Sequence, residues 1–271
     1  MKLQDKLSEY QQMHKAILAT NFYNLETLQG ILMAASRCRV PVILQLTQSS
    51  IDYIGLKEAV ALARTAMEDY GVEGWIHLDH GGSFELVKKC LEQGFDSVMI
   101  DASHESFDKN VEITCRVVEE AAKYNANVEA ELGYIAKLGQ EHGGDYTTVE
   151  EATEFINQTG VDALAIAIGS AHGFYKSAPN LNIPRLKEIH AVVKTILVLH
   201  GSSGIPDTML REAIQNGITK VNLATEIKDT FMKALKQTLL ETDEIDLRKV
   251  FPNATEQVVN LLTNKYKIVS I

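Results

Sequence analysis

Residues 75–80 of this chain read Trp-Ile-His-Leu-Asp-His, a short apolar run of the kind that forms a buried strand and that ends in Asp79 and His80. Two other apolar runs have a histidine at or just beyond their downstream end: residues 163–169, which precede His172, and residues 196–200, which end in His200. In a closed parallel barrel the downstream ends of the strands meet at one rim. The three histidines would then lie together, as three imidazole ligands of one metal ion do.

Short apolar runs alternate with helical patterns along the whole chain. The runs cover residues 17–21, 41–46, 75–79, 97–101, 127–131, 163–169, 196–200 and 219–223, and helical patterns between them cover residues 84–93, 109–124, 149–159 and 206–216. Eight strand-helix units predict an α/β protein with a closed (β/α)8 TIM barrel. An open doubly wound sheet is the alternative, but no Gly-x-Gly-x-x-Gly follows the first run. We therefore expect a single TIM-barrel domain over residues 1–271, with terminal helices in 241–271.

Length and composition narrow the possible partners. The chain has 271 residues, of which 45% are hydrophobic and 23% charged, which suits one barrel of about 250 residues. Its net charge of -10 argues against a general nucleic-acid binder. No signal core and no apolar run of about 18 residues is found, so we expect a cytoplasmic protein without a membrane span. The cysteines are widely spaced, which favours reduced thiols over disulfides.

Polar side chains close the apolar runs. They are Asn21, Gln45, Asp79 with His80, Asp101, Glu131, His172 shortly after the sixth run, His200 and Asn222. Because Val, Ile and Leu are expected inside a barrel, polar residues kept for the downstream ends indicate an active rim. Taken alone, Asn21 or Gln45 is equally well explained as a helix cap or a loop hydrogen-bonding residue.

The three histidines suit a catalytic zinc ion, which takes three protein ligands and keeps a fourth position open for a substrate oxygen. A lone histidine at a strand end would more often be structural, but three on separate strands favour ligation. We assign the neighbouring His77 to packing or to support of the ligands. The nearby carboxylates of Asp79, Asp101 and Glu131 could transfer protons, orient the histidines or hold a second cation. Asp79 is our preferred catalytic residue.

Two turns rich in small residues follow the seventh and eighth runs: Gly201-Ser202-Ser203-Gly204 and Asn222-Leu223-Ala224-Thr225. Barrels often bind phosphate at this place, because small residues expose backbone N–H groups and a following helix start favours an anion. A phosphorylated substrate is therefore expected. The alternative is an ordinary tight turn before Pro206.

Residues 1–240 resemble the class II, zinc-dependent ketose-bisphosphate aldolases, which include fructose- and tagatose-bisphosphate aldolases. The resemblance rests on seven motifs in order: 21–27 (Asn-Phe-Tyr-Asn-Leu-Glu-Thr), 77–81 (His-Leu-Asp-His-Gly), 99–103 (Met-Ile-Asp-Ala-Ser), 128–133 (Val-Glu-Ala-Glu-Leu-Gly), 167–173 (Ala-Ile-Gly-Ser-Ala-His-Gly), 199–204 (Leu-His-Gly-Ser-Ser-Gly) and 220–226 (Lys-Val-Asn-Leu-Ala-Thr-Glu).

The resemblance implies a role for each matching residue. His80, His172 and His200 would bind Zn²⁺, and Asp79 would be the acid/base at the C4 hydroxyl. Asp101 and Glu131 match an alternative or second metal site, and Glu141 aligns best with a mobile glutamate that protonates C3; a solvated loop glutamate is the alternative. The expected contacts to dihydroxyacetone phosphate are Gly173, Gly201, Ser202, Ser203, Asn222, Leu223, Ala224 and Thr225, and the other candidate substrate contacts are Asn21, Gln45, Thr47 and Lys176.

The resemblance also implies a reaction and partners. The expected reaction is reversible cleavage of a ketose 1,6-bisphosphate to dihydroxyacetone phosphate and an aldehyde such as glyceraldehyde 3-phosphate. Ala224 stands where fructose-type enzymes commonly have Asp or Asn and tagatose-type enzymes have Ala, so tagatose is the first candidate sugar and fructose the second. Backbone around Gly173, Gly201 and Ser203 resembles a Na⁺ or K⁺ site. We expect a homodimer or homotetramer.

Four alternative functions share features with this sequence. A related aldolase for a sulfonated or deoxy ketose 1-phosphate would use the same site. A Schiff-base aldolase would need a lysine at a strand end, whereas Lys220 falls at the beginning of the eighth run. A zinc hydrolase could use the same histidines to ionise water, but the two phosphate-type turns favour a lyase. A non-catalytic sugar-phosphate sensor would not need Asp79 together with a full metal set.

Overall fold

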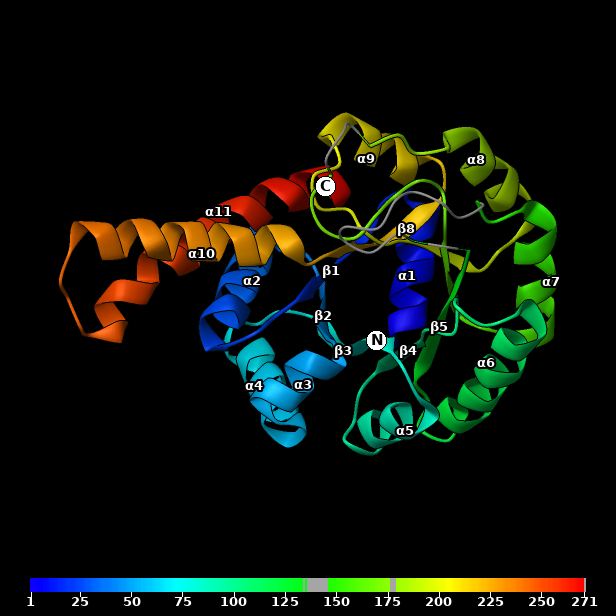
Figure 1. Ribbon diagram of the computed structural model, residues 1–271, viewed down its shortest axis with the longest axis horizontal. Helices are drawn as coiled ribbons and strands as arrows, with labels where there is room; N and C mark the ends of the chain where they lie inside the picture. The colour runs from blue at the N-terminus through cyan, green and yellow to red at the C-terminus, as the bar shows by residue number, and fades with distance from the viewer. Residues whose placement is uncertain (134, 136–145, 176–178, 271) are drawn as a thin grey trace.

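The computed structural model describes residues 1–133, 135, 146–175 and 179–270. Eight parallel strands pair in chain order and close on themselves, as the sequence predicts. Figure 1 shows helices packed around the outside of this barrel. The strands are β1 (Ile17–Asn21), β2 (Val42–Leu46), β3 (Gly74–Gly81), β4 (Ser97–Ile100), β5 (Asn127–Leu132), β6 (Ala163–Ile166), β7 (Ile196–Leu199) and β8 (Ile218–Leu223).

Some strand ends differ from the sequence expectation. β6 stops at Ile166 instead of residue 169, and β4 and β7 stop one residue before Asp101 and His200. These polar side chains therefore follow the strands and lie in the connecting loops. β3 is longer than expected, because it continues through Asp79 and His80 to Gly81.

Helices follow the strands and cover the outside of the barrel. Several begin with a side-chain cap; α7, for example, has a capping box in which Thr148 and Glu151 satisfy each other's backbone N–H groups. The described helices are α1 (Leu3–Gln12), α2 (Leu25–Cys38), α3 (Gln48–Ile54), α4 (Leu56–Asp69), α5 (Phe84–Glu92), α6 (Phe107–Ala122), α7 (Val149–Thr159), α8 (Ile183–Val192), α9 (Asp207–Gln215), α10 (Thr225–Glu241) and α11 (Leu247–Val269).

Helix α1 closes the upstream end of the barrel. Its apolar side chains Leu3, Leu7 and Tyr10 form one buried cluster with inward-facing residues of the strands, among them Ile17 and Trp75. The indole Nε1 of Trp75 also donates a hydrogen bond to the backbone oxygen of Met1, at 3.2 Å. The downstream end is left for the site.

The expectation that Val, Ile and Leu fill the barrel is correct only in part, because the inward residues near α1 are apolar but include alanines and Trp75. Higher in the barrel, three buried polar side chains lie below the rim: His77, Glu129 and Lys220. Lys220 and Glu129 are tolerated because they pair across the barrel, with Lys220 Nζ 2.8 Å from Glu129 Oε2, and His77 is hydrogen-bonded to Ser97 through Nδ1 at 2.8 Å.

The C-terminal part forms an arm. Figure 1 shows α10 and α11 as an antiparallel pair that projects from the barrel, with α11 returning along α2. Gly30 of α2 allows this approach, because a Cβ there would lie 2.9 Å from the Val258 side chain. The terminal helices expected in 241–271 are the single helix α11, which Pro252 does not interrupt. None of the described helices is both long enough and apolar enough to span a membrane.

Candidate active site

The three predicted metal ligands meet at the downstream rim of the barrel. The ring centroid of His80 lies 4.9 Å from that of His172 and 4.8 Å from that of His200. One ligand atom from each of the three side chains lies within 4.8 Å of the others, so the group could hold a metal ion. A second group of this kind shares His80 and adds Asp101 and Glu131.

A local irregularity in β3 directs both Asp79 and His80 to the site. Side chains alternate between the two faces of a strand, so consecutive residues ordinarily point apart. Between Leu78 and Gly81, however, the register to β4 shifts, and His80 has a positive φ of 49°. Gly81 permits this path, because a Cβ would lie 2.4 Å from the backbone oxygen of Met99. The bulge therefore places neighbouring carboxylate and imidazole groups at one centre.

Asp101 orients His80. The Nδ1 atom of His80 lies 2.8 Å from Asp101 Oδ2, and Ser103 Oγ donates to the other carboxylate oxygen at 2.7 Å. Burial would raise the pKa of Asp101, but these hydrogen bonds and the charge of His80 hold it well below its usual range. With Nδ1 engaged, Nε2 of His80 remains for a metal.

His200 is also oriented by a carboxylate, which lies deeper in the barrel. Its Nε2 lies 2.9 Å from Glu129 Oε1, while its Nδ1 lies 3.3 Å from Glu131 Oε2 without hydrogen-bond geometry. Burial opposes the charged imidazole, but the hydrogen bond to Glu129 and the two carboxylates raise the pKa of His200 to about 9. Buried Nδ1 and Oε2 atoms without partners are costly, and a cation between them would satisfy both. The residues present therefore fit a metal ion.

The loop after β6 delivers His172. Burial and the imidazoles of His80 and His200 lower the pKa of His172 to about 3, which keeps its ring neutral as a ligand must be. Tyr175 fixes this loop, because its hydroxyl accepts from the Ala171 N–H and donates to the Gly201 oxygen, at 2.9 and 2.8 Å.

Two amides hold the carboxylate of Asp79. Asn21 Nδ2 donates to Oδ2 at 2.8 Å, and Asn222 Nδ2 donates to Oδ1 at 3.3 Å. Gln45 in turn donates to Asn21 Oδ1 at 3.3 Å. Burial raises the pKa of Asp79, but the charges of His80, His200 and Lys220 and the hydrogen bond from Asn21 lower it overall, which favours the ionised carboxylate. The predicted contacts Asn21, Gln45 and Asn222 are thus brought to Asp79 in this structure.

The two phosphate-type turns lie against each other. Ser202 Oγ donates to the backbone oxygen of Asn222, and Ser203 Oγ accepts from the N–H of Glu226 at 3.2 Å. Gly201 has a φ of 66°, and a Cβ there would lie 2.3 Å from the Ala171 oxygen. Leu223 and Ala224 lead into Thr225, where α10 begins without a side-chain cap. The Glu226 N–H in the first turn of α10 is thus occupied by Ser203, and an anion would have to use the other N–H groups of this helix start.

The remaining predicted residues are less informative. Thr47 caps α3, since its hydroxyl accepts from the Ser50 N–H at 3.3 Å. Gly173 has a φ of 89°, which glycine adopts readily. Glu141 and Lys176 lie outside the described residues.

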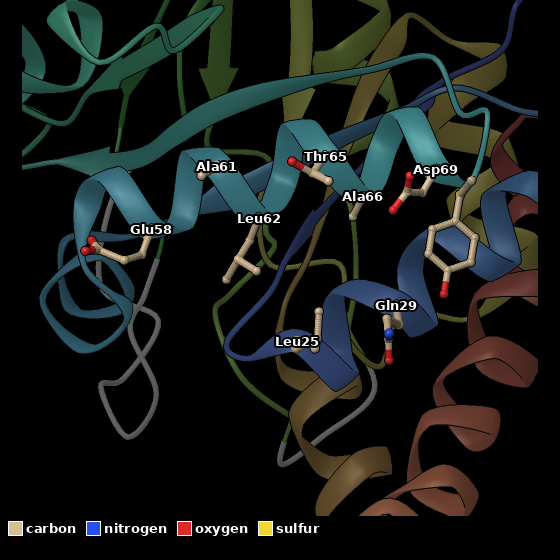
Figure 2. Close-up of a pocket in the computed structure, with 9 residues that line it drawn as sticks. Leu25, Gln29, Glu58, Ala61, Leu62, Thr65, Ala66 and Asp69 are labelled. Atoms are coloured by element: carbon tan, nitrogen blue, oxygen red, sulfur yellow. The ribbon is translucent and has the colours of Figure 1, made fainter.

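Two hollows in the surface differ in character. One of about 370 Å³ opens at the histidines and is lined by His80, Gly82, Asp101, His104 and His172. The other, shown in Figure 2, is a groove of about 650 Å³ between α2 and α4 that Leu25 and Leu62 line from opposite sides. None of the described residues that line this groove belongs to the predicted site. Size alone does not identify the active site here.

Sequence reasoning missed Glu129 and Lys220. Both lie two residues before a predicted site residue on the same strand, Glu131 and Asn222, and so face the same interior side. This spacing was a usable signal. The buried ammonium of Lys220 is paired with Glu129 and donates to Asn222 Oδ1 at 2.8 Å, which leaves it unsuited to a Schiff base.

Known proteins place the chain in a family. The family model described as "Fructose-bisphosphate aldolase class-II" matches residues 1–271. The "Probable fructose-bisphosphate aldolase" of Bacillus subtilis (strain 168) is 41% identical over 256 residues, covering 91% of this chain and 89% of that protein. The "D-tagatose-1,6-bisphosphate aldolase subunit GatY" of Klebsiella oxytoca is 39% identical over 243 residues, covering 88% and 86%.

A solved structure agrees with this assignment. The crystal structure of the YdjI aldolase from Escherichia coli K12 superposes with a TM-score of 0.90 at 30% sequence identity, over 99% of this chain and 97% of that one. The resemblance deduced from seven sequence motifs is therefore confirmed. The chain belongs to the class II fructose-bisphosphate aldolase family, and is thus a lyase of a family that depends on zinc.

Proposed function

We propose that this enzyme reversibly cleaves a ketose 1,6-bisphosphate to dihydroxyacetone phosphate and an aldehyde such as glyceraldehyde 3-phosphate. The observation that carries the proposal is the juxtaposition of Asp79 with the three imidazoles of His80, His172 and His200. These histidines would hold Zn²⁺, which when bound would stabilise the negative charge that develops on the ketone oxygen. Asp101 and Glu131 would orient the ligands or share a second metal position with His80.

Asp79 would begin the cleavage. Its carboxylate accepts the proton of the C4 hydroxyl, the C4 oxygen forms a carbonyl as the C3–C4 bond breaks, and the electron pair goes to the C3 fragment. The amides of Asn21 and Asn222 keep both carboxylate oxygens in place for this transfer. Protonation of C3 by Glu141 would complete the dihydroxyacetone phosphate product.

The anionic end of the substrate would bind at the two turns. Backbone N–H groups of Gly201–Ser203 and of Asn222–Thr225, which run from the end of β8 into α10, would contact the phosphate, and Gly173 and Lys176 are further candidate contacts. Backbone oxygens around Gly173, Gly201 and Ser203 would take Na⁺ or K⁺. Thr47 would lie toward the other end of the sugar.

Among the candidate sugars, we place tagatose 1,6-bisphosphate first and fructose 1,6-bisphosphate second. One relative is named for each sugar, and the identities of 41% and 39% do not separate them. Ala224 supports placing tagatose before fructose, because the resemblance associates alanine at this position with tagatose enzymes. A sulfonated or deoxy ketose 1-phosphate is third.

The test is a substrate panel with controlled metal content. Protein treated with a chelator should lose cleavage and regain it with zinc or cobalt. Activity that survives chelation and is trapped by borohydride would contradict the proposal and indicate an imine. A kcat/KM that favours fructose over tagatose 1,6-bisphosphate by more than about a hundredfold, or roughly 2.7 kcal/mol, would reverse the substrate order.

The oligomeric state is part of the same proposal. The end of the α10–α11 arm exposes Leu239, Leu240, Ile245 and Leu247, of which Leu240 and Ile245 are 83% and 91% exposed. Clustered exposed apolar side chains mark contact surfaces, so we expect a homodimer or homotetramer in which a second copy covers the arm. Light scattering should show an oligomer, and Leu240→Glu with Ile245→Glu should reduce its mass without unfolding the barrel. A monomeric wild-type protein would contradict the proposed oligomer.

A further inference from the structure

A lysine is buried in the middle of the barrel. Lys220 lies on β8, and only 1% of its surface is exposed. Its ammonium contacts a carboxylate of β5, Glu129 Oε2, at 2.8 Å and an amide of its own strand, Asn222 Oδ1, also at 2.8 Å. Such a charge is expensive to bury and needs well-placed partners. Each of these two partners contacts a different functional group of the site.

The first branch leads to His200. Glu129 uses Oε2 for Lys220 and Oε1 for His200 Nε2, at 2.9 Å. A hydrogen bond on one ring nitrogen sets the tautomer and the ring orientation, so His200 presents Nδ1 to the rim. Without the ammonium, Glu129 would be a buried carboxylate that has lost its nearest cation, and its position under His200 would not be maintained.

The second branch leads to Asp79. An asparagine side chain has a donor end and an acceptor end, and its neighbours decide which end points where. Because Lys220 can only donate, Asn222 must turn its oxygen to Lys220, which directs its Nδ2 to Asp79 Oδ1 at 3.3 Å. Without Lys220 the amide could turn and present its oxygen to the carboxylate, which is repulsive.

We propose that Lys220 is a positioning residue that keeps the imidazole of His200 and the carboxylate of Asp79 in a fixed relative arrangement, acting through Glu129 and Asn222. The inference rests on the proposed function, since it assumes that His200 binds the metal and that Asp79 transfers the proton. Lys220 itself would act only through these two side chains, because it is almost fully buried. The asymmetry of the site supports this role: the other oxygen of Asp79 accepts from Asn21 on β1, which in turn accepts from Gln45 on β2, and neither amide contacts the lysine.

Three variants separate positioning from mere stability. Lys220→Met roughly keeps the length of the side chain but removes the ammonium, so that Oε2 of the buried Glu129 loses its partner while Oε1 keeps His200. The double variant Lys220→Met with Glu129→Gln removes both charges, and replacing a whole buried pair by neutral groups is often harmless to stability. The matched control is Val221→Ala on the same strand, because Val221 is fully buried in the outer core and belongs to neither branch.

Each variant is measured in three ways: urea unfolding of the metal-free protein, zinc affinity by competition with a chromophoric chelator, and kcat and KM. We expect Lys220→Met to lower the free energy of unfolding and to bind zinc about 10- to 100-fold more weakly. At saturating zinc, its kcat should fall by a larger factor than its KM rises. The double variant should recover stability but neither zinc affinity nor kcat. Val221→Ala should lose stability alone.

The outcomes distinguish failure of the positioning role of Lys220 from failure of the proposed function. Two results would show that the lysine is only structural and that the inference is wrong. In the first, the double variant recovers stability, zinc affinity and kcat together. In the second, Lys220→Met folds and keeps zinc affinity and kcat within about twofold of the wild type. If Lys220→Met does not fold, the double variant decides by the same criteria. A wild-type protein that neither binds zinc nor cleaves any ketose phosphate would overturn the proposed function and this inference with it.

Discussion

The upstream and downstream halves of the barrel interior are built by the same strands but have opposite chemistry. Near α1, apolar inward residues of β1, β2, β3, β6 and β7 form one buried cluster with that helix: Ile17, Ala19, Ile43, Trp75, Ala163, Ala165, Ile196 and Val198. Two to four residues further along, the same faces carry Asn21, Gln45, His77, Asp79, His200 and, on other strands, Glu129 and Lys220. The comparison shows that one strand can serve packing at its start and chemistry at its end.

The physical reason lies in how each half satisfies its side chains. The upstream half gains stability by removing apolar surface from water, which requires shape but no specific partner. The downstream half must give every buried charge a partner of opposite sign or a hydrogen bond, and so each side chain depends on its neighbours. Changes to the downstream half should therefore alter function first, and changes to the upstream half should alter stability first.

Among changes to the downstream half, His200→Ala should have the largest effect on metal binding and activity. Two imidazoles would remain, and Glu129 and Glu131 would lose the ring that lies between them. We expect the loss of most bound zinc and of nearly all turnover, with the barrel still folded. Metal analysis by mass spectrometry together with circular dichroism checks this. Full zinc occupancy in the variant would contradict the assignment of His200 as a ligand.

Asp79→Ala should separate proton transfer from metal binding. The variant removes the carboxylate held by Asn21 and Asn222 but leaves all three imidazoles. We expect zinc to be retained and cleavage to fall by about two to four orders of magnitude, the range for a positioned acid/base. Steady-state kinetics at saturating zinc measure it. If only metal affinity falls, Asp79 supports the ligands and is not the base.

Ile196→Ala tests the upstream half on the same strand as His200. Ile196 is buried beside α1, so its truncation leaves a cavity. We expect unfolding in urea to require about 2–5 kcal/mol less free energy than in the wild type, while zinc affinity of the folded protein is unchanged. A marked loss of zinc affinity would show that packing in the upstream half is coupled to metal binding in the downstream half.

Ser97→Ala probes the boundary between the halves. Ser97 Oγ lies 2.8 Å from His77 Nδ1, and His77 is fully buried below the site. Because the variant leaves this nitrogen without its partner, we expect a loss of about 1–3 kcal/mol in stability. Zinc affinity and kcat should stay close to the wild type. Urea unfolding and chelator competition measure the two effects, and a larger change in kcat than in stability would extend the functional half down to His77.

Much of this protein can be recognised from its sequence. The apolar runs, their spacing and the helical patterns between them are local features, so they predict a closed barrel without reference to any distant contact. Residues that follow a strand are brought to the rim by topology alone, which is why His80, His172 and His200 could be grouped in advance. The motifs around them were sufficient to identify the family.

Only the tertiary structure decided how these side chains are supported. Whether Glu129 pairs with Lys220, and whether Asn21 and Asn222 hold Asp79, depends on the register between strands and on the closure of the barrel. The turn of His80 into the site depends on a shift in pairing between β3 and β4. These features have no local signature, because a buried polar group is stabilised by partners that are distant in the sequence and become neighbours only when the barrel closes.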